Sequence, residues 1–302
     1  MLSLIILYKW TVVAGLLAAP TLALLGCQLA TRDRSMQTLC VGQGAMVGVL
    51  IGMGVLHSFE DQLAFKAGPL VSALLLSALT YLLTDRIVAK RAASKNTYFS
   101  FVFALLMASG SLVSSVFPAL ESHMAQVYFG DLATLSINDS QVTIIASLIC
   151  LSLLILLTKS ISNQSFEWSV FGNLVSTKTN TWGHYGFKLI TLVVLCFSVQ
   201  FVGFLFTIAM LFLPTSLMSF LNTKGLRVHL MSCGLLSSVS AVAGFLLSLK
   251  FTRLPTVPLI VAIMFGLGLT ILAVEQLVIT LRTRVLSSQR KMEGAVLRSA
   301  RI

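Results

Sequence analysis

The sequence is poor in charged residues, and the charge it has is mostly of one sign. Only 10% of its 302 residues are charged, and 10 acidic residues stand against 21 lysines and arginines, for a net charge of +11. A water-soluble domain needs about a quarter of its residues charged. With 57% hydrophobic residues and a mean hydropathy of +0.94, the composition almost excludes a water-soluble protein. The basic residues lie in short segments between apolar runs, as the positive-inside bias explains without a nucleic-acid partner.

Catalytic, disulfide and metal-cluster patterns are also missing. There is no Walker A pattern, no H-E-x-x-H and no G-x-S-x-G, so the chain is not expected to be an enzyme. There is no C-x-x-C and no H-x-x-x-H pair either. The five cysteines lie in or beside apolar runs, at Cys27, Cys40, Cys150, Cys196 and Cys233. This spacing indicates neither a disulfide framework nor a zinc cluster.

Long apolar runs recur as far as residue 281. Each approaches the roughly 20 helical residues that cross a hydrocarbon core, and their recurrence fits a secretory signal poorly. The sequence therefore predicts an all-α, polytopic transmembrane helical bundle of about nine spans over 1–281, followed by a basic cytoplasmic tail over 282–302. The expected spans are 4–28, 39–57, 67–84, 97–118, 141–158, 187–203, 205–221, 228–249 and 257–281.

The placement of lysine and arginine predicts the orientation of these spans. Basic residues gather in segments that alternate with the acidic segment 121–139, which has none. Because cytoplasmic loops carry the basic excess, that segment is expected outside. The stretch 187–221 is too long for one ordinary span. Two short spans meeting near Gly203 keep the tail inside, and eight spans plus a re-entrant segment fit the charges equally well. The segments expected inside are 31–38, 85–96, 159–186, the segment with Lys224 and Arg227, and the tail, while the N-terminus is expected outside.

Five glycines lie close together in the second expected span. They form two G-x-x-x-G patterns, at 44–48 and at 48–52. Small residues at this spacing let helix backbones approach closely. The patterns serve either contacts between helices of one chain or an interface between subunits.

Three short segments combine turn and proline residues in a distinctive order. They are Y-F-G-D-L-A-T-L-S-I-N-D at 128–139, I-A-M-L-F-L-P-T-S-L-M-S-F-L at 208–221 and L-K-F-T-R-L-P-T-V-P-L-I-V-A at 249–262. In order and spacing they resemble the permease family of bacterial ABC importers for zinc, manganese and iron, over nearly the whole chain. The residues that carry the resemblance are Gly130, Asp131, Pro214 and Pro255. Each also has a plain structural explanation, as a turn, a helix kink or a helix start.

The resemblance implies the permease subunit of an ATP-driven importer for divalent metal, zinc ahead of manganese and iron. Such a permease binds no cofactor itself. Its implied partners are a cytoplasmic ATPase that uses ATP, an extracytoplasmic metal-binding protein, a second permease copy of the same or another kind, and membrane lipid. The implied location is a bacterial inner membrane, with the C-terminus in the cytoplasm. A secondary transporter and a non-conducting partner in a heterodimeric permease remain alternatives.

The expected inside loop 159–186 is the candidate for ATPase docking. In such importers a cytoplasmic loop of the permease contacts the ATPase. Here the loop lacks the acidic and proline residues of the family's short F-D-P-E-like element. Aromatic residues in the loop would fill a groove on the partner, or would lie at headgroup depth in the membrane. The docking candidates are Phe166, Trp168, Phe171, Gly172 and Asn173.

The family's usual path ligands are replaced in this chain. The family carries G-D-x-x-S-H at the start of its second span, and the alignment puts Leu39 at the Asp position and Gln43 at the His position. Cys40, Gln43 and Met46 share roughly one helical face and form a softer path suited to thiophilic ions. In so apolar a chain, chance also accounts for this grouping, so the metal stays undetermined.

Glu275 is the one acid well inside an expected span. An intramembrane carboxylate is a candidate functional group by default. Glu275 also lies within two turns of the expected cytoplasmic end, where it would pair with Arg282 or reach water. It is the fourth path candidate.

Overall fold

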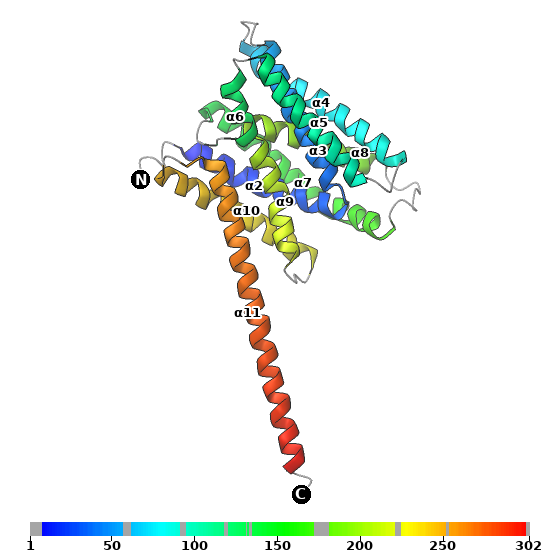
Figure 1. The fold of residues 1–302 in the computed structure, drawn as a ribbon, viewed down its shortest axis with the longest axis vertical. Helices are drawn as coiled ribbons and strands as arrows, with labels where there is room; N and C mark the ends of the chain where they lie inside the picture. The colour runs from blue at the N-terminus through cyan, green and yellow to red at the C-terminus, as the bar shows by residue number, and fades with distance from the viewer. Residues whose placement is uncertain are drawn as a thin grey trace.

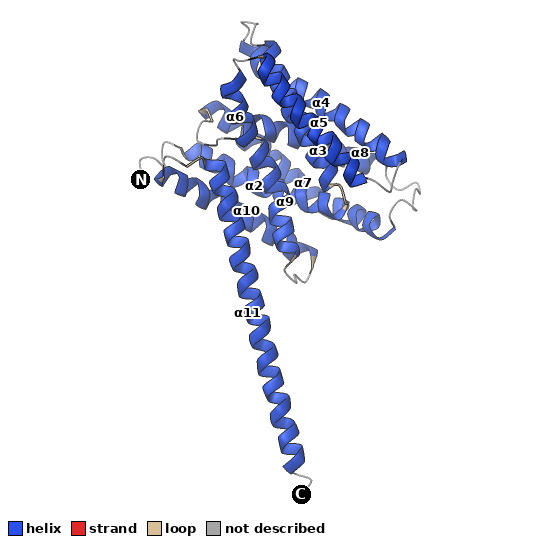
Figure 2. Cartoon of the chain, viewed as in Figure 1, coloured by secondary structure: helices blue, strands red, loops and turns tan. Residues whose placement is uncertain are grey.

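The computed structural model describes residues 8–56, 62–90, 95–117, 120–130, 132, 135–171, 181–220, 225–251 and 254–299. Within these ranges the regular structure is helical (Figures 1 and 2). The helices are α2 (Lys9–Thr31), α3 (Ser35–Leu56), α4 (Gln62–Lys90), α5 (Lys95–Val116), α6 (Glu121–Phe129), α7 (Ile137–Phe171), α8 (Thr181–Phe201), α9 (Phe204–Ser219), α10 (Leu226–Lys250) and α11 (Thr256–Ser299).

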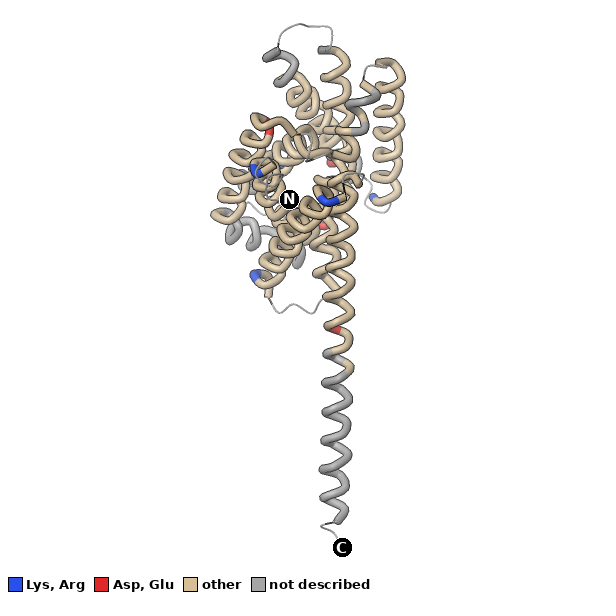
Figure 3. The backbone as a smooth tube through the Cα atoms, turned by 90° about the vertical axis from the view of Figure 1, so that its left-hand side faces the viewer, with Lys and Arg blue, Asp and Glu red and all other residues tan. Residues whose placement is uncertain are grey.

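The helices confirm the predicted all-α bundle. Among the described residues, seven helices are long and apolar enough to cross a membrane, and two shorter apolar helices cover 186–201 and 204–219. All nine expected spans fall on these helices. The short helix α6 is additional and lies in the segment expected outside. Charged residues are sparse along the described bundle, as Figure 3 shows.

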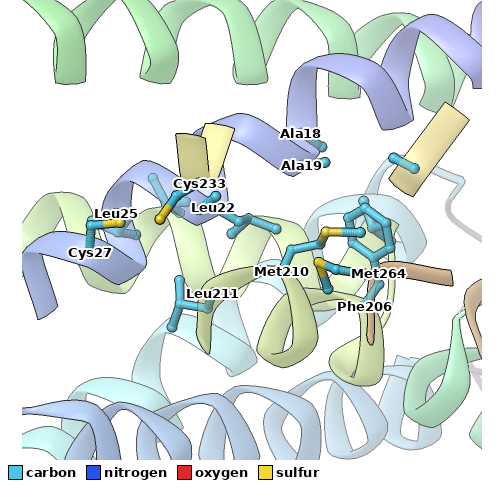
Figure 4. Packing of buried hydrophobic residues seen from close by; sticks show 14 of the residues in the cluster. Ala18, Ala19, Leu22, Leu25, Cys27, Phe206, Met210, Leu211, Cys233 and Met264 are labelled. Carbon is cyan, nitrogen blue, oxygen red and sulfur yellow. The ribbon is translucent and has the colours of Figure 1, made fainter. Parts of the chain in front are cut away.

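The outer helices expose apolar side chains, as a chain surrounded by lipid requires. Leu75, Leu112 and Leu156, on α4, α5 and α7, are between 66% and 80% exposed. The centre, by contrast, is built around α2, α3 and α9, whose small and apolar residues are buried (Figure 4). Apolar surface thus faces both the core and the surroundings, so these helices have little amphipathic character to read from sequence.

Glycines set the closest helix contacts within the chain. A Cβ built on Gly48 would lie 2.6 Å from the Ala73 Cα, and one on Gly26 would overlap the Leu211 carbonyl. Gly44 and Gly52 face α4 in the same way as Gly48. The G-x-x-x-G patterns therefore pack α3 on α4 inside one subunit, the first of the two roles expected for them.

The two short helices α8 and α9 run in opposite directions. At the start of α8, the Lys188 Nζ lies 3.0 Å from the Asp85 carboxylate at the end of α4. At the other end, Gly203 separates α8 from α9 and packs on the Gly130 backbone. From there α9 returns until its Thr215 reaches Cys27, near the end of α2. Two helices that meet near Gly203 fit both predictions for 187–221, two short spans or a re-entrant segment.

Several helices extend past the expected spans. Helix α7 continues to Phe171 and α8 begins at Thr181, so 19 of the 28 residues of the expected loop 159–186 are helical, and α11 continues to Ser299 through the expected tail. The sequence 137–171 contains neither glycine nor proline, so nothing stops the helix at the membrane boundary. In Figure 1, α11 leaves the body of the molecule as a single long helix.

Candidate functional site

Three of the four path candidates lie together in the interior of the bundle. Cys40, Gln43 and Met46, on α3, are each at most 1% exposed. The Cys40 thiol donates a hydrogen bond to the Phe99 carbonyl of α5 at 3.1 Å. Met46 belongs to an apolar cluster formed by α3, α4, α6 and α8. The predicted face of α3 is therefore buried among its neighbours rather than directed at lipid.

Gln43 is the unusual member of this face. Within the described part of the chain, neither its amide nitrogen nor its amide oxygen makes a hydrogen bond of ordinary geometry, and the Tyr128 hydroxyl is a polar group close enough to interact with the amide. A buried polar group without a partner costs about 1–3 kcal/mol. A folded bundle that keeps such a group carries a cost that packing alone does not explain.

Glu275 is not part of this group. It is partly exposed on α11, whose main packing partners are α10 and α9. Helix α3, which carries the other three candidates, packs mainly against α4 and α5. The structure therefore separates the fourth path candidate from the other three.

The other predicted site residues have varied positions. Gly130 ends α6 with φ 71° and contacts Gly203, and Pro214 lies inside α9. Pro255 is exposed immediately before α11. Three docking candidates, Phe166, Trp168 and Phe171, lie on the extension of α7. The remaining predicted positions, outside the described residues, are Asp131, Gly172 and Asn173.

A charged network closes the end of the bundle expected to face the cytoplasm. The Asp85 carboxylate lies 3.0 Å from the Lys188 Nζ and 3.6 Å from the Arg34 Nη1. Arg34 also donates to the Tyr81 hydroxyl. This network ties α3, α4 and α8 together, and a small pocket lies beside it, lined in part by Arg34, Tyr81 and Lys188.

Arg32 lines the same pocket in an unusually apolar position. Its guanidinium lies 3.9 Å from the centre of the Phe187 ring, and the residue is 5% exposed. Burial, together with the nearby charge of Arg34, lowers the pKa of Arg32 to about 10. The side chain stays charged at neutral pH and is stabilised there by the aromatic face.

The structure also gathers three metal-binding side chains that the sequence analysis did not group. Cys27 of α2 meets His229 and Cys233 of α10, and their ligand atoms lie within 4.8 Å of one another. Figure 4 shows the two cysteines side by side. His229 and Cys233 are four residues apart, so they share a helix face. That H-x-x-x-C spacing was a readable signal, whereas the contribution of Cys27 depends on helix packing.

Comparison with known proteins shows which fold and which family this chain resembles. The structure titled PsaBC from Streptococcus pneumoniae in complex with Fab has a similar fold, with a TM-score of 0.69 and 16% sequence identity over 87% of this chain and 89% of that chain. A search of curated protein sequences found no match. The model of the ABC 3 transport family matches residues 5–275. The chain therefore belongs to the ABC 3 transport family, as its three segments predicted, and is a multi-pass membrane permease subunit rather than an enzyme.

Proposed function

We propose that this permease imports zinc across a bacterial inner membrane, with its C-terminus in the cytoplasm. The observation that carries the choice of metal is the buried face of α3, which presents a thiol, a thioether and an unpartnered amide. Manganese prefers carboxylate, carbonyl and water ligands, while sulfur suits softer ions and zinc accepts sulfur, nitrogen and oxygen alike. Zinc therefore fits Cys40, Gln43 and Met46 better than manganese does.

The path proposed for the ion runs from the α3 face toward the charged inner end. Glu275, partly exposed on α11, is proposed to meet the ion on the cytoplasmic side. The proposed partners are a cytoplasmic ATPase that supplies the energy, an extracytoplasmic metal-binding protein and a second permease copy. The extension of α7 through Phe166, Trp168 and Phe171 supports the docking proposal, because a helix beyond the membrane boundary offers the ATPase a rigid surface.

The test is uptake of radioactive zinc by cells in which this chain is the only permease. Zinc accumulation is expected to depend on a co-purifying ATPase and to be reduced more by unlabelled zinc than by manganese or iron. Cys40→Ala should lower uptake at unchanged expression, while Cys150→Ala, a cysteine on α7 away from this face, should not. Preferential competition by manganese overturns the choice of metal. A chain that binds no ATPase and shows proton-coupled uptake alone overturns the importer itself.

A second function is favoured by the same positions. Leu39 and Gln43 replace both family ligands, so a chain that pairs with another permease and does not conduct ions itself also accounts for them. The two functions differ in one result. A conducting permease supports uptake as the sole permease, whereas a non-conducting partner needs a second, different permease chain in the same cell.

A further inference from the structure

Cys27, His229 and Cys233 form a set of donors with the chemistry and spacing of a zinc site. Their ligand atoms lie within 4.8 Å of one another. Tetrahedral bonds of about 2.0–2.3 Å to zinc place ligand atoms roughly 3.5–3.8 Å apart. The cluster therefore needs a contraction of about 1 Å to close on an ion. Side-chain rotations on two neighbouring helices are enough for that movement.

The charge balance of such a site suits its buried position. Cys27 is 3% exposed and Cys233 is fully buried, in the part of the bundle that lies within the apolar helices. Two thiolates and a neutral imidazole cancel the charge of one divalent ion, so the loaded site carries no net charge into a low dielectric. A harder ion such as Mn²⁺ gains little from sulfur ligands. The donor set therefore selects a thiophilic divalent ion.

The three side chains leave one coordination position of the ion free, so the ion can be exchanged. Three protein ligands leave the fourth tetrahedral position open, which distinguishes exchangeable sites from closed structural ones. The Thr215 hydroxyl lies 3.2 Å from the Cys27 sulfur. Its oxygen is therefore close enough to be the fourth ligand. The Cys233 thiol points at the Pro214 carbonyl at 3.6 Å. The proline segment of α9 thus forms one wall of the cluster.

The cluster lies toward the end of the bundle expected to face the cytoplasm. Cys27 is in the last turns of α2 and His229 is in the first turn of α10. Helix α9 connects the cluster with the proposed path. Its Phe204 and Ile208 contact α3 at Gly42, and its Pro214 and Thr215 contact the cluster.

We propose that Cys27, His229 and Cys233 bind one Zn²⁺ ion at the inner end of the bundle, with the Thr215 hydroxyl or a water in the fourth position. Binding releases the two thiol protons to solvent and involves no change of oxidation state. The site joins α2 to α10 across α9. Its role as a binding position for the transported ion near the cytoplasmic end rests on the proposed importer function, whereas the binding itself does not.

The test titrates the reduced, metal-free, full-length chain in detergent with Co²⁺ and then with Zn²⁺. Co²⁺ is expected to give the near-ultraviolet absorption of cobalt–thiolate bonds at one ion per chain, and Zn²⁺ but not Mn²⁺ should remove it. Cys27→Ser and Cys233→Ser should each weaken binding by more than about 100-fold, because losing an outer partner of a metal ligand alone costs about 10- to 100-fold. The matched control is Cys196→Ser, which alters an equally buried cysteine on α8.

A second measurement needs no variant and so does not depend on how the variants fold. X-ray absorption at the zinc edge of the wild-type chain should show two sulfur neighbours at about 2.3 Å and a nitrogen at about 2.0 Å. A shell of oxygen and nitrogen alone, or equal zinc affinity in Cys27→Ser and Cys196→Ser, overturns the site. Zinc uptake is measured separately. If the bound zinc has sulfur neighbours but the chain transports no zinc, the proposed binding site stands and the proposed importer function is rejected.

Discussion

At the scale of single residues, Gln43 combines a stability cost with a position in the proposed path. Its amide is buried without a hydrogen-bond partner among the described residues. Gln43→Leu keeps the volume and removes the unpaired polar atoms, so it should raise the stability of the bundle by about 1–3 kcal/mol. Zinc uptake should fall at the same time. Thermal unfolding in detergent and uptake in cells measure the two effects.

The control for this substitution lies on the same helix. The Gln37 amide donates to the Thr84 hydroxyl at 3.2 Å and accepts from Arg34 at 3.3 Å. Gln37→Leu removes both of these hydrogen bonds and should lower the melting temperature. If both substitutions change stability in the same direction, the amide of Gln43 has a partner and the argument for a path role fails.

At Gly26, α2 lies so close to α9 that the methyl group of an alanine does not fit between them. Alanine is favoured over glycine in a helix by about 1 kcal/mol, but a Cβ at Gly26 would overlap the Leu211 carbonyl of α9. Gly26→Ala should therefore lower the melting temperature by roughly 3–8 °C, the range for overpacking in a chain of this size. Gly234→Ala, where the nearest atom is the Pro20 Cβ at 3.9 Å, should be neutral or stabilising. Equal effects at the two sites would contradict the close α2–α9 contact.

At the scale of helices, the turn between α8 and α9 depends on two glycines. Gly203 has φ 101°, and its Cα packs directly on the Gly130 backbone. Gly203→Ala should destabilise the chain more than Gly225→Ala. Both residues have positive φ with an extended ψ, a conformation that costs other residues about 1–3 kcal/mol, but a Cβ at Gly225 meets no atom within 4 Å. Thermal unfolding of the two variants compares them, and a milder effect at Gly203 would contradict the contact.

Hydropathy and the placement of basic residues predicted which segments cross the membrane. They did not predict where the helices end or which helices are in contact. The membrane requires about 20 apolar residues per span, so runs such as 228–249 locate α10 closely. Beyond the boundary, polar residues still favour a helix, which is why α7 continues to Phe171. Cys27 and Cys233 are over 200 residues apart in sequence, and helices that are apolar all round carry no periodic signal of which face meets which.

At the scale of the whole molecule, two groups of contacts mark opposite ends of the bundle. Arg34, Asp85 and Lys188 join α3, α4 and α8 at one end, and Gly130 contacts Gly203 at the other. Because basic residues gather at the first end, we expect it to face the cytoplasm. The same expectation would put the proposed zinc site of Cys27, His229 and Cys233 on the release side of the importer.

This orientation is tested with reporter fusions. Green fluorescent protein attached after residue 302 should fluoresce, because it folds in the cytoplasm, and alkaline phosphatase at the same point should be inactive, because it needs an oxidising compartment. Fusions after Ser136, in the segment expected outside, should give the opposite pair of results. Active phosphatase at residue 302 would show that the C-terminus lies outside, and the expected orientation would then be reversed. It would then put the network of Arg34, Asp85 and Lys188 on the outer face, against the charge bias that sets membrane orientation.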